Sequence, residues 1–341
     1  MRRLSPLVIP SVVLLCLTLS GAPVRASEPP VRLILDTDIG NDVDDAMALS
    51  MIHSLQDRGE CELLAVTVTK DNPYAAPAVD VFNTYHGRSS IPIGAVRRGA
   101  TPDDGKYLKE LATAERDGRP RWPHALKRGE DAPEAVAVLR KTLAAQADGA
   151  VVIVQVGFCT NLARLLESGP DALSPLGGLE LVKKKVRLLS LMGGGFGPNA
   201  AKNEYNVVTD LPSARKLFST WPTPVVASGF EVGSAILHSG RSMRSDYRWA
   251  ADDPLVFSYE HYRGLGNDQP TWDLTSVLYA VRPDRGYFDL SPAGVIAVES
   301  DGRTTFTPKA DGPHRYLIVR PEQIVRAREA QELLCSQPPH K

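Results

Sequence analysis

The chain of 341 residues has a hydrophobic content of 43% and a formal net charge of −1. This length and composition allow a sizeable core, in one large α/β domain or two smaller ones. Because the charge is balanced and no basic patch with interleaved aromatic residues occurs, we expect no nucleic-acid partner.

The first 26 residues have the features of a secretory signal peptide. Two arginines follow the first methionine, residues 7–19 are apolar but too short to span a bilayer comfortably, and small residues suit cleavage after Ala26. We therefore expect residues 27–341 to form an exported protein, periplasmic or secreted, without membrane contact after cleavage. The alternative is an uncleaved N-terminal anchor.

Past this segment, short apolar runs alternate with helical patterns. The expected strands are Arg32–Leu35, Leu63–Thr69, Ile91–Gly94, Val151–Val156, Val186–Leu191 and Val225–Ala227. The expected helices are Asp44–Leu55, Ala76–His86, Ala132–Gln146, Leu162–Glu167 and Pro212–Phe218. Short, continuously apolar strands in βα alternation predict a single α/β domain with a mostly parallel open sheet and helices on both faces. Residues 294–307, with an Asp-Gly turn, predict a C-terminal β-hairpin, and residues 321–334 a last helix.

Polar clusters follow the ends of several expected strands, at residues 36–45, 70–72, 156–161, 192–195 and 204–206. Ligands of parallel α/β sheets bind outside the carboxyl ends of the strands, so these loops are expected to meet over one pocket. Residues 97–131 form a long polar stretch rich in Gly, Pro and charge. This stretch is either a flap over the pocket or a mobile excursion.

The first cluster places five aspartates within ten residues, at Asp36, Asp38, Asp42, Asp44 and Asp45. Helix capping accounts for one or two acidic residues, not five. Coordination of a hard cation would offset the repulsion, although the spacing is not that of an EF-hand. A phosphotransferase of the haloacid dehalogenase type has an Asp-x-Asp pair after its first strand, but it gives the other aspartates no role.

The whole stretch DTDIGNDVDDAMAL, residues 36–49, resembles the signature of the nucleoside hydrolases, the inosine–uridine preferring N-ribohydrolases. Further similar motifs occur in the family's order. They are Ala65-Val66-Thr67-Val68 with Asn72, Ile91-Pro92-Ile93-Gly94, Val154-Gln155-Val156-Gly157 with Thr160-Asn161, Met192-Gly193-Gly194 with Glu204-Tyr205-Asn206, and Trp272-Asp273.

The resemblance implies a tightly bound Ca²⁺ and hydrolysis of the N-glycosidic bond of a ribonucleoside or related N-riboside. It also implies a small-molecule substrate and a possible homo-oligomer. Carried over by position, the metal ligands are Asp38, Asp45, the backbone carbonyl of Val156, and Asp273. The implied ribose contacts are Asn72, Met192, Glu204 and Asn206, with Asn199 as a looser match because its loop is shorter than usual.

The chemistry of the reaction agrees with such residues. Cleavage of the bond develops positive charge on the sugar, which carboxylates and amide oxygens stabilise. Ca²⁺ can hold the ribose 2′- and 3′-hydroxyls and the attacking water, and an aspartate beside the metal can take the water's proton. Asn and Glu side chains can discriminate ribose from a deoxysugar by hydrogen bonds.

The sequence departs from the family pattern at two places. Extra residues after Gly40 leave two candidates for the base: Asp44, favoured because it begins the helical pattern, and Asp42, which lies four residues after Asp38. Trp272 occupies the position of a histidine that often serves as the acid for the departing base.

Trp272 can stack on a nucleobase, and His261, Tyr259 or Tyr262 can donate a proton instead. These departures keep an alternative open, a metal-stabilised riboside-binding protein with little or no catalysis.

Overall fold

The computed structural model describes residues 29–197, 203–250 and 252–340. The expected signal peptide and Asn199 lie outside these ranges, so both remain predictions. No helix within them is long and apolar enough to cross a bilayer.

A ten-stranded sheet forms the centre of the molecule, in the order β13-β12-β14-β8-β7-β6-β1-β2-β3, with β11 paired to β14. The strands are β1 (Val31–Thr37), β2 (Cys61–Lys70), β3 (Ile93–Ala100), β6 (Val151–Gln155), β7 (Val186–Met192), β8 (Val225–Ser228), β11 (Asp289–Leu290), β12 (Gly294–Val298), β13 (Thr304–Pro308) and β14 (His314–Ile318). All pairings from β14 to β3 are parallel, and those of β11, β12 and β13 are antiparallel. The predicted fold class is confirmed.

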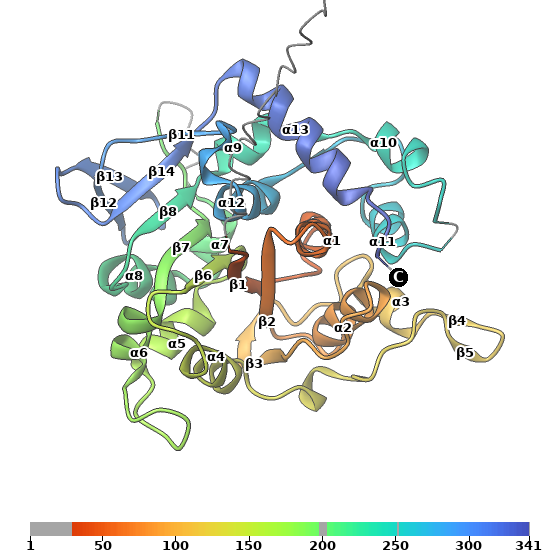
Figure 1. The fold of residues 1–341 in the computed structure, drawn as a ribbon, viewed down its shortest axis with the longest axis horizontal. Helices are drawn as coiled ribbons and strands as arrows, with labels where there is room; N and C mark the ends of the chain where they lie inside the picture. The colour runs from red at the N-terminus through yellow and green to blue at the C-terminus, as the bar shows by residue number, and fades with distance from the viewer. Residues whose placement is uncertain (1–28, 198–202, 251, 341) are drawn as a thin grey trace, which may run out of the picture.

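Helices cover both faces of the sheet (Figure 1). One face carries α1 (Asp44–Asp57), α2 (Ala75–Tyr85), α12 (Trp272–Val281) and α13 (Pro321–Cys335); the other carries α4 (Ala135–Ala144), α5 (Thr160–Glu167), α6 (Gly178–Lys185) and α8 (Leu211–Thr220). Successive strand residues point to opposite faces, so Leu33 and Leu35 of β1 enter the first core and Ile34 enters the second. This two-sided burial explains why the strand is apolar throughout.

The chain reverses its direction of travel across the sheet at β1. It runs outward through β2 to the edge strand β3 and then returns to β6 on the other side of β1. The loops that leave β1 and β6 therefore diverge at their carboxyl ends, which is the usual place of a ligand site in open α/β sheets.

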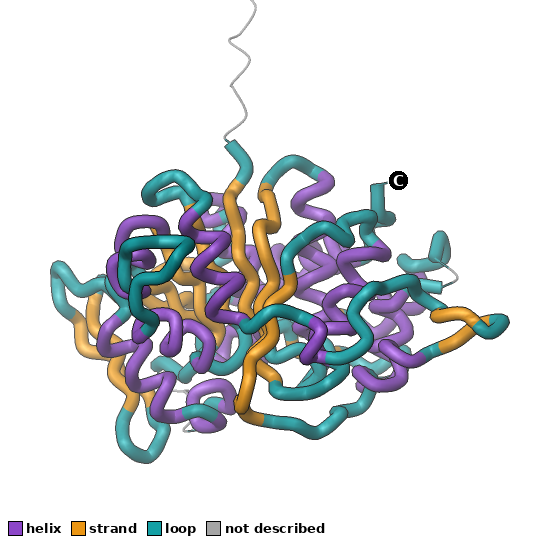
Figure 2. Tube along the Cα trace, turned by 90° about the horizontal axis from the view of Figure 1, so that it is seen from below, coloured by secondary structure: helices purple, strands orange, loops and turns teal. Residues whose placement is uncertain are grey.

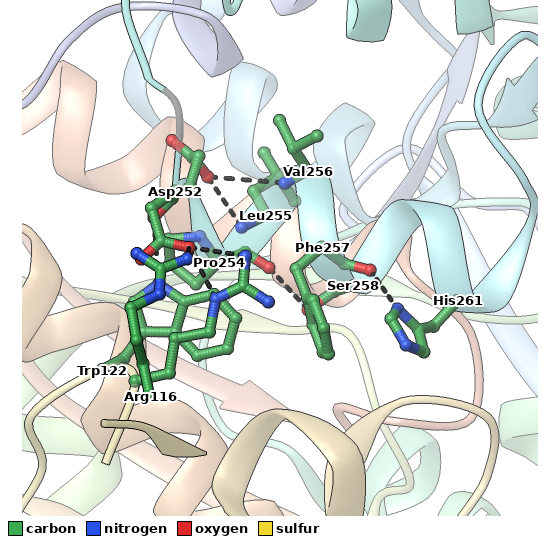
Figure 3. Close-up of polar contacts among 11 residues, drawn as sticks. Arg116, Trp122, Asp252, Pro254, Leu255, Val256, Phe257, Ser258 and His261 are labelled. Atoms are coloured by element: carbon green, nitrogen blue, oxygen red, sulfur yellow. Dashed lines mark hydrogen bonds and ion pairs between the residues drawn. The ribbon is translucent and has the colours of Figure 1, made fainter. Parts of the chain in front are cut away.

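The polar stretch at residues 97–131 is a packed segment that includes α3 (Leu108–Thr113), β4 (Glu115–Arg116), β5 (Arg119–Pro120) and the short helix η1 (Gly129–Asp131). Its β4–β5 hairpin extends from one edge of the molecule (Figures 1 and 2). Arg116 forms an ion pair with Asp252 at 2.9 Å, and the Trp122 Nε1–H donates to the Asp252 carbonyl (Figure 3). Arg121 forms a second ion pair with Asp252 at 2.5 Å. These contacts tie the segment to the start of α11 (Pro254–Tyr262).

Candidate active site

A cavity of about 340 Å³ opens at the carboxyl ends of the central strands. Its wall combines acidic, amide and aromatic side chains. The lining residues are Asp38, Asn41, Asp42, Asp45, Val156, Met192, Glu204, Tyr205, Asn206, Phe230, Tyr262, Trp272 and Asp273. The loops after β1, β6 and β7, which the sequence predicts to meet over one pocket, all contribute to this lining, whereas the predicted loop at residues 70–72 does not. Helix α12 adds Trp272 and Asp273.

Two loops pack closely beside this cavity, next to its lining residues Asp38 and Val156. A Cβ atom at Gly157 would lie 2.5 Å from both the Asp38 backbone nitrogen and the Thr69 Oγ1. Only glycine therefore allows the loop after β6 to pass directly against the end of β1. The Thr37 hydroxyl at that end donates to the Asp45 carboxylate, which fixes one acidic side chain to the strand.

Four carboxylates gather beside the cavity. One oxygen from each of Asp42, Asp44, Asp45 and Asp273 lies within 4.8 Å of the others. The N–H of Asp273, in the first turn of α12, donates to Asp44 Oδ2 at 3.1 Å. The other carboxylate oxygen of Asp44 is buried and has no hydrogen-bond partner within the described residues. An all-oxygen donor set with an unpartnered buried oxygen fits a hard divalent cation.

Burial makes this cluster costly to ionise without a counter-charge. It raises the pKa values of Asp44, Asp45 and Asp273 well above the usual range, and repulsion between neighbouring carboxylates raises them further. Burial also raises the pKa of Asp38 to about 7, against the lowering effect of its hydrogen bond with Asn41. Either protons or a cation must therefore offset the charge.

Glu204 and Asn206 form another part of the cavity wall. Glu204 caps α7 (Tyr205–Thr209), and its carboxylate accepts from the backbone N–H groups of Asn206 at 2.8 Å and of Val207 and Gly194 at 3.0 Å. The Asn206 amide donates to the Val156 carbonyl at 2.8 Å. Both side chains are therefore held rigidly in the cavity wall, as recognition of a sugar requires.

Aromatic rings form the mouth of the cavity. Phe230, at the start of α9 (Phe230–Ala235), and Trp272 are stacked with ring centroids 5.4 Å apart. The Trp272 Nε1–H donates to the Phe230 carbonyl and to Ser234 Oγ, both at 3.0 Å, so the indole is fixed in orientation. Tyr205 and Tyr262 complete this wall. Flat rings at a cavity mouth suit stacking on a heterocyclic base.

The family profile described as inosine-uridine preferring nucleoside hydrolase matches residues 33–322. The chain belongs to this family. The predicted enzyme class, a hydrolase acting on N-glycosyl bonds, is thereby confirmed.

Solved structures of nucleoside hydrolases share the fold at low sequence identity. A plant nucleoside hydrolase has a TM-score of 0.66 and 18% identity, covering 91% of this chain and 100% of its own. An inosine-uridine preferring nucleoside hydrolase from Bacillus anthracis has 0.67 and 18%, and a purine-preferring ribonucleoside hydrolase from Gardnerella vaginalis has 0.64 and 19%. Each of these two covers 89% of this chain and 99% of its own. A comparison with curated protein sequences gives no match.

Most of the predicted site residues in this nucleoside hydrolase line the cavity, but Asn72, His261, Tyr259 and Asp44 do not. The Asn72 amide donates to the Pro102 carbonyl at 2.9 Å and to Asp104 Oδ1 at 3.0 Å, so it holds the polar segment instead of facing the cavity. His261 Nδ1 lies 2.8 Å from the Phe257 carbonyl on the exposed side of α11 (Figure 3). Its neighbour Tyr262 lines the cavity.

The two candidate bases differ in position. Asp42 lines the cavity and is partly exposed, whereas Asp44 is fully buried behind it. A base must reach the water whose proton it takes, so this geometry favours Asp42 as the base. The sequence pattern had favoured Asp44.

Asn41 and Lys70 were not predicted from the sequence to belong to the site. The Asn41 amide donates to Asp38 Oδ2 at 2.6 Å, and its carbonyl accepts from Lys70 Nζ at 2.7 Å. The Lys70 side chain is fully buried at the end of β2. The sequence did contain a signal for Lys70. It is a lysine at the end of an apolar strand, in a predicted sheet whose first strand ends at the aspartate cluster.

Proposed function

We propose that this protein is a Ca²⁺-dependent hydrolase that releases the base from a ribonucleoside or a related N-riboside. The observation that carries the proposal is the position of the acidic cluster, which opens onto a cavity with a rigid polar wall and an aromatic mouth.

Asp45 and Asp273 are the residues best placed to hold the cation, because they belong to the expected ligand set and to the carboxylate cluster. Asp38 and the Val156 carbonyl, the other expected ligands, belong to residues of the same cavity wall. When bound, a divalent cation orients the sugar hydroxyls and makes a nearby water more acidic.

The protein's own residues supply the remaining chemistry. Asp42, on the wall, accepts the proton of the attacking water. Glu204 and Asn206 hold the sugar, and the surrounding negative charge stabilises the positive charge that develops on it. Trp272 and Phe230 bind the base by stacking.

Base release from a panel of ribosides, including p-nitrophenyl riboside, with and without a chelator tests this proposal. We expect turnover that disappears with the chelator and returns with Ca²⁺. Asp42→Asn should lower kcat by about 10²- to 10⁴-fold, the usual contribution of a general base. Riboside binding without turnover by the Ca²⁺-loaded wild type would instead support the alternative, a riboside-binding protein.

If Asp42→Asn lowers kcat less than Asp44→Asn does, Asp44 is the base. Calorimetry with Ca²⁺ on both variants separates loss of the base from loss of the cation. We also propose that the protein is exported and that it forms a homo-oligomer. Recovery of the mature protein from the culture medium or periplasm tests export. The molar mass of this protein, measured by light scattering, tests the oligomeric state.

A further inference from the structure

We propose that this cavity selects N-ribosides whose base carries a positive charge, such as pyridinium ribosides. The inference names a substrate class and rests on the proposed hydrolase function. Three independent features of the described residues point to it: the charge of the wall, the aromatic mouth and the surroundings of the departing base.

The wall of the cavity is strongly acidic. Asp38, Asp42, Asp45, Asp273 and Glu204 line it, and none of the described lining residues is a lysine, arginine or histidine. With all five of these carboxylates ionised, the two charges of a divalent cation and the one charge of the nearby Lys70 would balance only three of them. A positively charged base is therefore favoured over a neutral one by the field inside the cavity.

The aromatic mouth offers ring faces to a ligand. The indole N–H of Trp272 is already used by Phe230 and Ser234, so the side chain presents its face instead of a donor. Phe230 keeps 38% of its surface exposed and Tyr205 keeps 50%. Aromatic faces attract cations, with desolvated pairs contributing most.

A cationic base needs no proton when it departs. His261 directly precedes the lining residue Tyr262 in the chain. Its ring is hydrogen-bonded to the Phe257 carbonyl and does not line the cavity. Residues 198–202, outside the described ranges, contain no histidine, and Lys202 is their one ionisable side chain. A neutral purine or pyrimidine would leave as an anion unless a proton reached it, and general acids usually contribute about 10²- to 10⁴-fold to such steps.

The reaction of a pyridinium riboside is balanced without an acid. The bond between the sugar C1′ and the ring nitrogen breaks, and its electron pair goes to the nitrogen and makes the base neutral. The water oxygen forms the new bond to C1′, and one proton of that water goes to the carboxylate base. The products are ribose, a neutral pyridine and one proton.

Two matched comparisons test the selectivity. The first is the dissociation constant of 1-methylnicotinamide, a cation, against that of neutral nicotinamide, which isolates recognition from reactivity. We expect the cation to bind about 2- to 30-fold more tightly. The second is kcat/KM for nicotinamide riboside against uridine and for 7-methylguanosine against guanosine, each divided by its uncatalysed rate.

Substitutions at the mouth sharpen the test. Trp272→Leu should remove most of the preference for 1-methylnicotinamide, whereas Trp249→Leu should keep it, because Trp249 stacks on Tyr247 and does not line the cavity. Trp272→His, which adds a possible acid, should raise the kcat/KM ratio of guanosine to 7-methylguanosine. Tyr262→Phe should leave the preference for cationic substrates in place.

Equal binding of the charged and neutral nicotinamides, or equal corrected turnover within the matched pairs, would overturn the proposed selectivity. A Tyr262→Phe variant that loses only neutral nucleosides would also overturn it, because Tyr262 would then be the acid. Absence of turnover on every riboside would count against the hydrolase function instead, and the binding pair would still decide the selectivity.

Discussion

Asn41 shows how a neutral side chain can organise an acidic site. It joins the buried ammonium of Lys70 to the carboxylate of Asp38 through two hydrogen bonds of opposite direction. Groups that orient a metal ligand typically change metal affinity by about 10- to 100-fold when removed. We expect Asn41→Ala to weaken Ca²⁺ binding within this range, measured by calorimetry on protein stripped with a chelator.

The substitution replaces one neutral side chain by another, so its effect reports orientation and not a change of charge. Asn267→Ala is the matched control, because Asn267 is exposed and its side-chain amide donates to the nearby carbonyls of Arg263 and Gly264. Unchanged Ca²⁺ affinity in Asn41→Ala would show that Asp38 needs no such support.

At the scale of elements, the polar segment and the loop after β1 depend on each other. Gly105 has a φ of +66°, and a Cβ atom there would lie 2.2 Å from the Gly40 carbonyl oxygen. The Tyr107 hydroxyl donates to the Asp42 carbonyl at 2.9 Å from the same segment. We expect Gly105→Ala to displace the aspartate loop and to lower both stability and Ca²⁺ affinity, although Gly105 does not line the cavity.

Gly118 provides the control for backbone strain. Its φ is +73°, but a Cβ atom there meets nothing within 4 Å. Gly118→Ala should therefore cost only about 1 kcal/mol, the cost of the left-handed conformation, and leave Ca²⁺ binding unchanged. Urea unfolding and calorimetry on both variants measure the difference. Equal effects of the two substitutions would mean that the segment does not support the site.

The elements also show which features the sequence could reveal. The aspartate cluster was predictable because it follows an apolar strand and precedes a helical pattern. Strand β14 was not predicted: its residues His314–Ile318 lack a regular alternation, and it pairs in parallel with β8, far earlier in the chain. The role of Asn72 was likewise hidden, because its partners Pro102 and Asp104 lie in a segment whose path depends on tertiary packing.

For the whole molecule, the buried titratable groups make stability depend on pH in two opposite ways. Burial lowers the pKa values of His86 and His238 to about 4, so at these two residues the unfolded chain binds more protons than the fold between about pH 4 and 6.5, and their contribution to stability rises with pH there. Burial raises the pKa values of Asp36, Asp38 and Glu204 to about 7. These carboxylates bind more protons in the fold, so their effect has the opposite sign.

Above about pH 6.5 the histidines of the unfolded chain lose their remaining protons, so the contribution of the carboxylates dominates. Stability of the metal-free protein should therefore fall from pH 6.5 to 8, by about 1.4 kcal/mol per pH unit for each proton that the fold retains. Ca²⁺ favours the ionised carboxylates, so its stabilising effect should be larger at pH 8 than at pH 6.5. Calorimetric Tm values with chelator and with excess Ca²⁺ at both pH values measure this, and a metal-free Tm that rises across the interval would contradict it.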